Sequence, residues 1–249
     1  MKIAIHALLG SLLLISAMVP AGLAQAPLRQ DKPADAGHAG HDHYDIDPKL
    51  LIKAQNAYEI VKQRIPLVVD VRSRVEYNAE HIKGAISYPY QVIRTSNQFP
   101  FGKDRQLLLY CGCPHHLSGL SAESLKEKGY TNVKVIDEGY WGWKHFGFPI
   151  VLNPNAPKQM SMDVEGQLMQ NGVALAYQDI FLLHPETGQL EATRTNSQGA
   201  FKMGLHFRGL NPDDQLVFHL KDDTRLQTVR ISELTGPMLL DVPQRLARR

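Results

Sequence analysis

Four short apolar runs between residues 67 and 136 constrain the fold of this chain more than any other feature of its sequence. Helical patterns separate the runs, and one of them, from Leu117 to Lys128, ends at Gly129 as a helix C-cap would. Near-continuous apolar strands that alternate with helices are typical of a parallel sheet covered on both faces. We therefore predict an α/β module over residues 47–152. The runs are 67–69, 85–88, 107–110 and 133–136.

The module is predicted to open with a helix. Asp47 and Pro48 have the residue types of an N-cap and of a first helical position. Apolar side chains then recur at helical spacing from Leu50 to Val61. This pattern predicts an amphipathic helix that begins at residue 48 and covers a core.

The pattern changes to strands after residues 153–160, which we interpret as a linker. Turn signals such as Asn171-Gly172 and Thr187-Gly188 separate the strand-like segments, and no helical period is present. We expect residues 161–249 to form a small antiparallel β-sandwich. The strand-like segments are 180–183, 189–194, 200–207, 215–220 and 226–231.

Residues 1–24 have the three-part layout of a secretory signal peptide. Lys2 precedes an apolar stretch from Ile3 to Val19, and small residues lead up to Ala24. We expect cleavage after Ala24 and export of the chain, to the periplasm or beyond. A membrane anchor is the alternative, but the apolar stretch is shorter than the roughly 20 residues of a span. The mature chain is therefore predicted to have no membrane span.

Residues 25–46 contain almost no large apolar side chains, so we predict a flexible linker there. His38, His41 and His43 form a short His-rich tract, which is a weak candidate for Zn or Cu binding. Mobile polar filler is at least as good an interpretation of these histidines.

Charge and cysteine content narrow the function. The 27 Lys and Arg nearly balance the 25 Asp and Glu, and a basic cluster occurs only at the extreme C-terminus. We therefore expect no nucleic-acid partner. Cys111 and Cys113 are the two cysteines of the chain, which excludes a disulfide framework. A CxC in an exported protein favours a chemical role over a structural one.

Cys111 follows the third apolar run and precedes a predicted helix. Ligands of open parallel sheets bind beyond the carboxyl ends of the strands, so this cysteine is in a working position. A helix N-terminus presents N–H groups and the positive end of its dipole, which favours thiolate over thiol. The same environment would stabilise a persulfide anion.

A family resemblance covers nearly the whole α/β module. LVVDVRSRVEYNAEHIKGAISYPY at 67–90, LLLYC at 107–111 and VKVIDEGYWGWKHFGFPI at 133–150 resemble the single-domain rhodaneses. The resemblance implies that Cys111 accepts sulfane sulfur as a persulfide and passes it to a thiol or cyanide, without a resident cofactor. It also implies that Asp70 and Arg72 support the active-site loop. The matching positions are Asp70, Arg72, Glu76, His81, Gly84, Ala85, Pro89, Gly139 and Trp143.

The active-site loop departs from the family pattern, which usually places an arginine just before the helix. Here neither Arg nor Lys is present, and neutral histidines attract a thiosulfate dianion poorly. We therefore expect only weak thiosulfate:cyanide activity, dependent on Cys111. The loop residues are Gly112, Pro114, His115, His116 and Leu117.

Cys113 leaves several functions open. It would act as a resolving thiol towards a persulfide or sulfenic acid on Cys111. Alternatively, the CxC serves thiol–disulfide redox chemistry, or binds Cu or Zn together with His115 and His116. A non-catalytic interaction module is the last alternative.

The C-terminal segment resembles the transthyretin-like sandwich of carboxypeptidase regulatory domains. The best-matched part is the turn from Thr195 to Phe201. The resemblance carries no catalytic constellation, so we expect this domain to bring a protein partner to Cys111. The expected partners are thus a sulfur donor, a thiol acceptor and a docking protein.

Overall fold

The computed structural model describes residues 46–112 and 114–243. These residues all belong to one compact unit, which extends over Ala39–Arg249. The predicted signal peptide, the histidines at 38, 41 and 43, and Cys113 lie outside the described residues. Among the described residues, none of the helices is long and apolar enough to cross a membrane. The division into domains at 47–152 and 161–249 stays a prediction.

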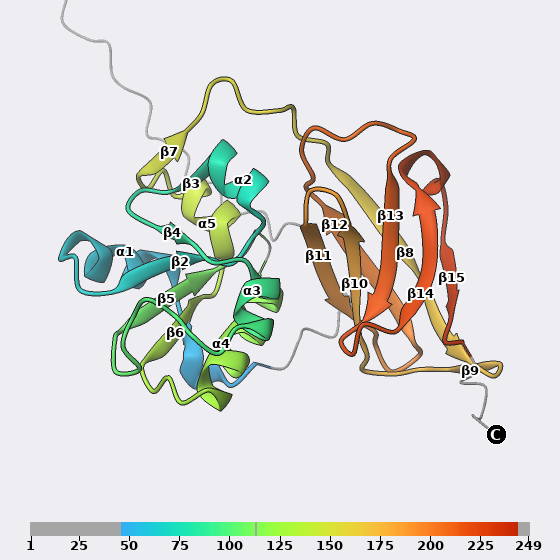
Figure 1. The fold of residues 1–249 in the computed structure, drawn as a ribbon, viewed down its shortest axis with the longest axis horizontal. Helices are drawn as coiled ribbons and strands as arrows, with labels where there is room; N and C mark the ends of the chain where they lie inside the picture. The colour runs from blue at the N-terminus through green and yellow to red at the C-terminus, as the bar shows by residue number, and fades with distance from the viewer. Residues whose placement is uncertain (1–45, 113, 244–249) are drawn as a thin grey trace, which may run out of the picture. The chain divides into compact units, whose positions relative to one another are not determined.

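The first part of the chain forms a five-stranded sheet in the order β1-β6-β5-β2-β4, in which all neighbouring strands are parallel (Figure 1). This order confirms the predicted α/β class and puts β5, the strand before Cys111, at the centre. The four predicted runs all contain strands. The strands are β1 (Leu51–Ile52), β2 (Leu67–Asp70), β4 (Ile86–Ser87), β5 (Leu107–Tyr110) and β6 (Val133–Ile136).

Helices cover both faces of this sheet, as predicted. Alternate residues of a strand point to opposite faces, and β5 follows this rule: Leu107 and Leu109 pack with α3 and α4, whereas Leu108 and Tyr110 pack with α1 and α5. Figure 1 shows the strands between α1 on one side and α3 and α4 on the other. The helices are α1 (Ala54–Lys62), α2 (Arg74–Ala79), α3 (Tyr90–Thr95), α4 (His116–Glu127) and α5 (Gly139–His145).

The predicted end of α4 is confirmed, but the predicted start of the first helix is wrong. Gly129 adopts a φ of +88°, the left-handed conformation of a helix C-cap. Asp47 and Pro48 instead open a 3-10 turn of three residues, Pro48–Leu50. Residues 51 and 52 then pair with β6, and α1 begins at Ala54. Pairing with an edge of the sheet overrode the helical spacing.

The second part of the chain contains two four-stranded sheets. One core cluster draws buried side chains from strands of both sheets. The antiparallel prediction is wrong for one pair, because β15 lies parallel to β8. A separate antiparallel pair joins β3 (Glu80–Ile82) to β7 (Ile150–Leu152). The sheets consist of β10 (Asp179–His184), β11 (Gln189–Arg194), β13 (Gln215–Leu220) and β14 (Arg225–Arg230), and of β8 (Met162–Gln170), β9 (Val173–Ala174), β12 (Ala200–Leu205) and β15 (Met238–Asp241).

The central strand predicts a large difference between two leucine truncations. Leu109→Ala should lower the free energy of unfolding by about 2–5 kcal/mol, because Leu109 is fully buried and a cavity would remain. Leu152→Ala, at a side chain that is 60% exposed, should change it by less than about 0.5 kcal/mol. Urea denaturation of both variants checks this. Equal losses would show that β5 is not the centre of the core.

Candidate active site

Cys111 leaves the carboxyl end of β5 and enters the loop that leads to α4. Its exposed fraction is 1%, and it shares a core cluster with Leu117, the second residue of α4. The N-terminus of α5 fixes the backbone here: the Cys111 carbonyl accepts a hydrogen bond from the N–H of Tyr140 at 2.8 Å, and the Gly112 carbonyl accepts one from Trp141 at 3.4 Å. The predicted cysteine is therefore held by elements on both sides.

The structure places the side chain of Ser118 next to Cys111. Its Oγ lies 3.3 Å from the Cys111 Sγ, within hydrogen-bonding distance for sulfur. Ser118 is fully buried and belongs to the first turn of α4. A hydroxyl donor and the positive end of a 12-residue helix both favour a sulfur anion over a neutral thiol. The predicted helix start was the sequence signal that would have pointed to this serine.

The two histidines of the loop face different carboxylates. His115 adopts a left-handed φ of 35° just before α4, and its Nδ1 lies 3.0 Å from Oδ1 of Asp137, which follows β6. His116, the first residue of α4, has its Nε2 3.4 Å from Oδ1 of Asp179 in β10. The neighbouring Pro114 is exposed. Among the described residues, no group of three metal-binding side chains is present.

Asp179 is shared between His116 and an arginine. Arg194 of β11 donates through its Nε to Asp179 Oδ1 at 3.0 Å. Burial lowers the pKa of His116 below its ordinary value, and this outweighs the opposite effect of Asp179. Burial would raise the pKa of Asp179, but its contacts with His116 and Arg194 hold that pKa below its ordinary value. At neutral pH the imidazole is therefore neutral and the carboxylate ionised.

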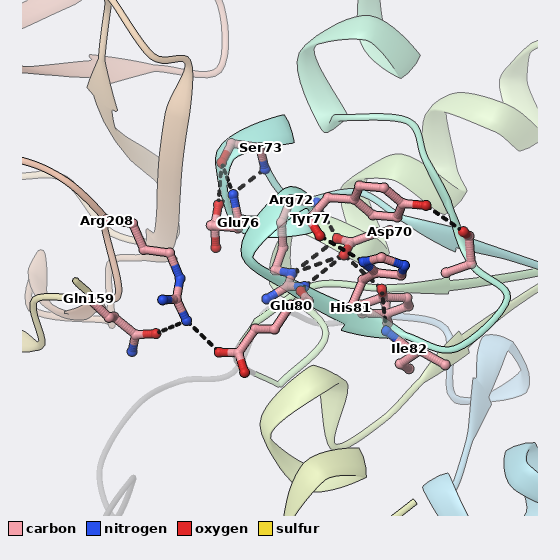
Figure 2. Close-up of polar contacts among 12 residues, drawn as sticks. Asp70, Arg72, Ser73, Glu76, Tyr77, Glu80, His81, Ile82, Gln159 and Arg208 are labelled. Atoms are coloured by element: carbon pink, nitrogen blue, oxygen red, sulfur yellow. Dashed lines mark hydrogen bonds and ion pairs between the residues drawn. The ribbon is translucent and has the colours of Figure 1, made fainter. Parts of the chain in front are cut away.

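Asp70 and Arg72 form a buried ion pair (Figure 2). Arg72 donates from Nε to Oδ1 of Asp70 at 3.0 Å and from Nη2 to Oδ2 at 2.7 Å, a bidentate geometry. Nη2 also donates to the Glu80 carbonyl at 2.7 Å. The Tyr110 hydroxyl donates to Asp70 Oδ2 at 2.7 Å, which connects β5 to the pair.

Arg72 also approaches the loop itself. Its guanidinium lies 4.2 Å from the centre of the Tyr140 ring, a cation–π distance. A Cβ on Gly112 would come within 3.8 Å of the Arg72 Cδ and 3.4 Å of the Trp141 Nε1. Burial alone would lower the pKa of Arg72, but the Asp70 carboxylate outweighs it and raises that pKa. The guanidinium therefore stays charged next to the loop.

Glu76 of α2 is a further acidic residue close to Arg72, and Glu191 of β11 lies close to Glu76. Glu76 closes a capping box with Ser73 at the start of α2, where its Oε2 accepts from the Ser73 hydroxyl at 2.8 Å. Burial, with Glu191 of β11 adding repulsion, raises the pKa of Glu76 to about 7, although Arg72 opposes this. The ring of His206 lies 5.2 Å from that of Trp141.

Glu80 connects β3 to the C-terminal sheets (Figure 2). Its carboxylate accepts a hydrogen bond from Lys144 of α5 at 2.6 Å and another from Arg208, which lies beyond β12, at 2.5 Å. Arg208 also donates to Gln159 at 2.8 Å. Burial would raise the pKa of Glu80, but its bond to Lys144 and its other polar contacts lower it, so both cations face a carboxylate.

Residues 47–146 match the family model described as a Rhodanese-like domain. A protein named Thiosulfate sulfurtransferase GlpE, from Coxiella burnetii, is 32% identical over 89 residues, which cover 35% of this chain and 80% of that protein. The chain belongs to the rhodanese-like family. This family and its sulfurtransferase relatives support a sulfurtransferase-type function for the rhodanese-like domain.

The chain is also similar to a second curated protein and to a solved structure. The uncharacterized protein slr1261 of Synechocystis is 30% identical over 129 residues, covering 51% of this chain and 71% of that protein. A solved rhodanese-like domain of the Alr3790 protein from Anabaena is 21% identical, with a TM-score of 0.40, over 44% of this chain and 85% of that one.

The structure brings most of the predicted site residues of the rhodanese-like domain together. Cys111, Gly112 and Leu117 lie where β5, α4 and α5 meet, and Arg72 lies against them. The supporting role of Asp70 and Arg72 stays a prediction. Sequence reasoning missed Ser118, Asp137 and Asp179. Ser118 lies in the first turn of a predicted helix and Asp137 directly follows a predicted strand, but nothing local in the sequence connects Asp179 with the loop.

Glu76 predicts a pH-dependent stability. A carboxyl whose folded pKa is raised to about 7 stabilises the fold at low pH, and this contribution is lost as the pH rises from about 4.5 through 7. Between pH 5 and 8 the free energy of unfolding should therefore fall more in the wild type than in Glu76→Gln, by on the order of 2–3 kcal/mol. Urea denaturation at both pH values measures the difference.

Glu59→Gln is the matched control, because Glu59 is an exposed carboxylate on α1. This variant should keep the wild-type pH dependence. If Glu76→Gln also keeps it, Glu76 does not titrate in this range.

Proposed function

We propose that this chain is an exported sulfurtransferase that moves sulfane sulfur through a persulfide on Cys111 to a thiol acceptor. One observation carries the proposal. The Cys111 Sγ lies at the carboxyl end of the central strand, 3.3 Å from the Ser118 hydroxyl in the first turn of α4. A hydroxyl donor at a helix N-terminus stabilises the anion that both half-reactions require.

The reaction has two displacement steps. The Cys111 thiolate attacks the sulfane sulfur of the donor, a new S–S bond forms, and the donor's leaving group departs with the electron pair of the old bond. The thiolate of the acceptor then attacks the outer sulfur of the Cys111 persulfide and releases Cys111 as a thiolate. The charge on Cys111 is thus present before and after transfer, and in the persulfide anion between the steps.

The surrounding charges favour a persulfide donor over thiosulfate. Arg72 is paired with Asp70, and Arg194 is paired with Asp179. Neither guanidinium offers the uncompensated positive charge that would attract a dianion. The name of the Coxiella relative says that it uses thiosulfate; for this chain we propose a small persulfide donor, since Cys111 is 1% exposed.

We also propose roles for the parts that flank the domain. Cys113 would attack the inner sulfur of the Cys111 persulfide, forming a disulfide and releasing hydrosulfide. The sheets after residue 160 would form a transthyretin-like sandwich that recognises a protein partner, in line with their shared core. The signal-like residues up to Ala24 support export.

Sulfur-transfer assays with the variants Cys111→Ser and Ser118→Ala test the proposal. Cys111→Ser should abolish transfer from a glutathione persulfide donor and the mass increase of about 32 Da that marks the persulfide. Ser118→Ala should lower the transfer rate about five- to tenfold, because the sulfur anion loses a charge-assisted hydrogen bond.

Ser121→Ala is the matched control, since Ser121 lies one turn further along α4, is fully buried and donates to the Leu117 carbonyl. Its transfer rate should stay close to that of the wild type. Transfer that persists in Cys111→Ser would rule the proposed function out. Equal losses of the transfer rate in Ser118→Ala and Ser121→Ala would assign Ser118 a purely structural role.

A further inference from the structure

Asp179 and Arg194 are fixed opposite each other by the pairing of two strands. They occupy directly paired positions in the antiparallel ladder of β10 and β11. The Arg194 Nε donates to Asp179 Oδ1 at 3.0 Å. Opposite charges at directly paired positions stabilise an antiparallel ladder. The contact with Arg194 therefore fixes the position of the Asp179 carboxylate independently of the loop.

The same strands pack against the loop that carries Cys111. Leu190 and Ala192 of β11 belong to the core cluster that contains Cys111 and Leu117. Asp179 is 7% exposed, and so is His116, whose Nε2 lies 3.4 Å from the carboxylate. The contact between the C-terminal sheet and the loop is thus a buried one.

The charges around His116 determine where its proton resides. The groups that face the ring are Asp179 of β10, Arg194 of β11 and the adjacent His115. A neutral imidazole whose Nε2 faces a carboxylate carries its proton on Nε2, since the carboxylate only accepts. The contact with Asp179 at 3.4 Å thus favours the Nε2–H tautomer.

The position of His116 matters because Ser118 lies two residues further in the same helical turn. A change in the ring's anchor would move the first turn of α4, and with it the hydroxyl that lies 3.3 Å from the Cys111 Sγ. His115, by contrast, is anchored by Asp137 within the rhodanese-like domain itself. The second anchor of the loop comes from the C-terminal sheets.

We propose that Asp179 is a positioning residue for sulfur transfer, which orients His116 and through it the first turn of α4. This inference rests on the proposed function and deepens it. It makes the C-terminal region a part of the active site, in addition to any role in docking a partner. The rhodanese-like domain alone would lack this anchor.

A double-mutant cycle in the full chain tests the inference. Asp179→Asn should lower both the sulfur-transfer rate and the alkylation rate of Cys111 by on the order of tenfold, the effect of losing one charge-assisted contact. His116→Gln should have a similar effect, and the double variant should be no worse than His116→Gln, because both changes break one contact. Asp241→Asn, at an exposed carboxylate on β15, should match the wild type.

Nitrogen NMR of the His116 ring gives a readout that a merely structural role would not change. The wild type should show the Nε2–H tautomer at neutral pH, and Asp179→Asn should shift the ring towards a mixture of tautomers. Wild-type rates and tautomer in Asp179→Asn would overturn the inference. So would an Asp179→Asn effect that adds in full to that of His116→Gln. If the wild type transfers no sulfur, the proposed function fails, whereas the alkylation rates and the tautomer still decide this inference.

Discussion

The bidentate ion pair between Asp70 and Arg72 organises the region from which Cys111 emerges. Removing two charges from water is costly, and a buried pair is tolerated only where further hydrogen bonds satisfy it. Here the Tyr110 hydroxyl and the Glu80 carbonyl complete the set, so β2, β3 and β5 are joined at one point. The Tyr140 ring above the guanidinium adds α5. This geometry fits the predicted role of Asp70 and Arg72 in supporting the loop at Gly112.

The C-terminal sheets form a second support, which acts from outside the rhodanese-like domain. Arg208 reaches Glu80, and Asp179 reaches His116. Apolar contacts accompany both, since Tyr90 of α3 stacks on Phe181 of β10 with 5.7 Å between ring centres. Polar contacts give this interface its orientation, and the apolar ones exclude water from it. The environment of Cys111 thus depends on contacts between residues that lie 63 and 128 positions apart in the sequence.

Local patterns in the sequence were sufficient for the central strands and for α4, but not for contacts between distant elements. The apolar runs and the glycine at 129 identified the central strands and the end of α4, because both signals are local. The short strand at residues 51–52 was missed, since its pairing with β6 overrode a helical spacing. Asp179 was missed because its partner in the loop, His116, lies 63 positions away in the sequence. The parallel pairing of β15 with β8 likewise has no local signal.

Charge balance around the loop connects the fold to the choice of sulfur donor. Arg72, Lys144, Arg194 and Arg208 each face a carboxylate that is buried. A paired cation contributes little field beyond its partner, so the described residues leave the surroundings of Cys111 close to neutral. A neutral site accommodates one sulfur anion through Ser118 and the helix dipole, but it gives a dianion no compensation for lost hydration. Arg72 and Arg194 are thus paired with carboxylates instead of replacing the missing loop arginine, which supports the proposed selectivity for a singly charged persulfide.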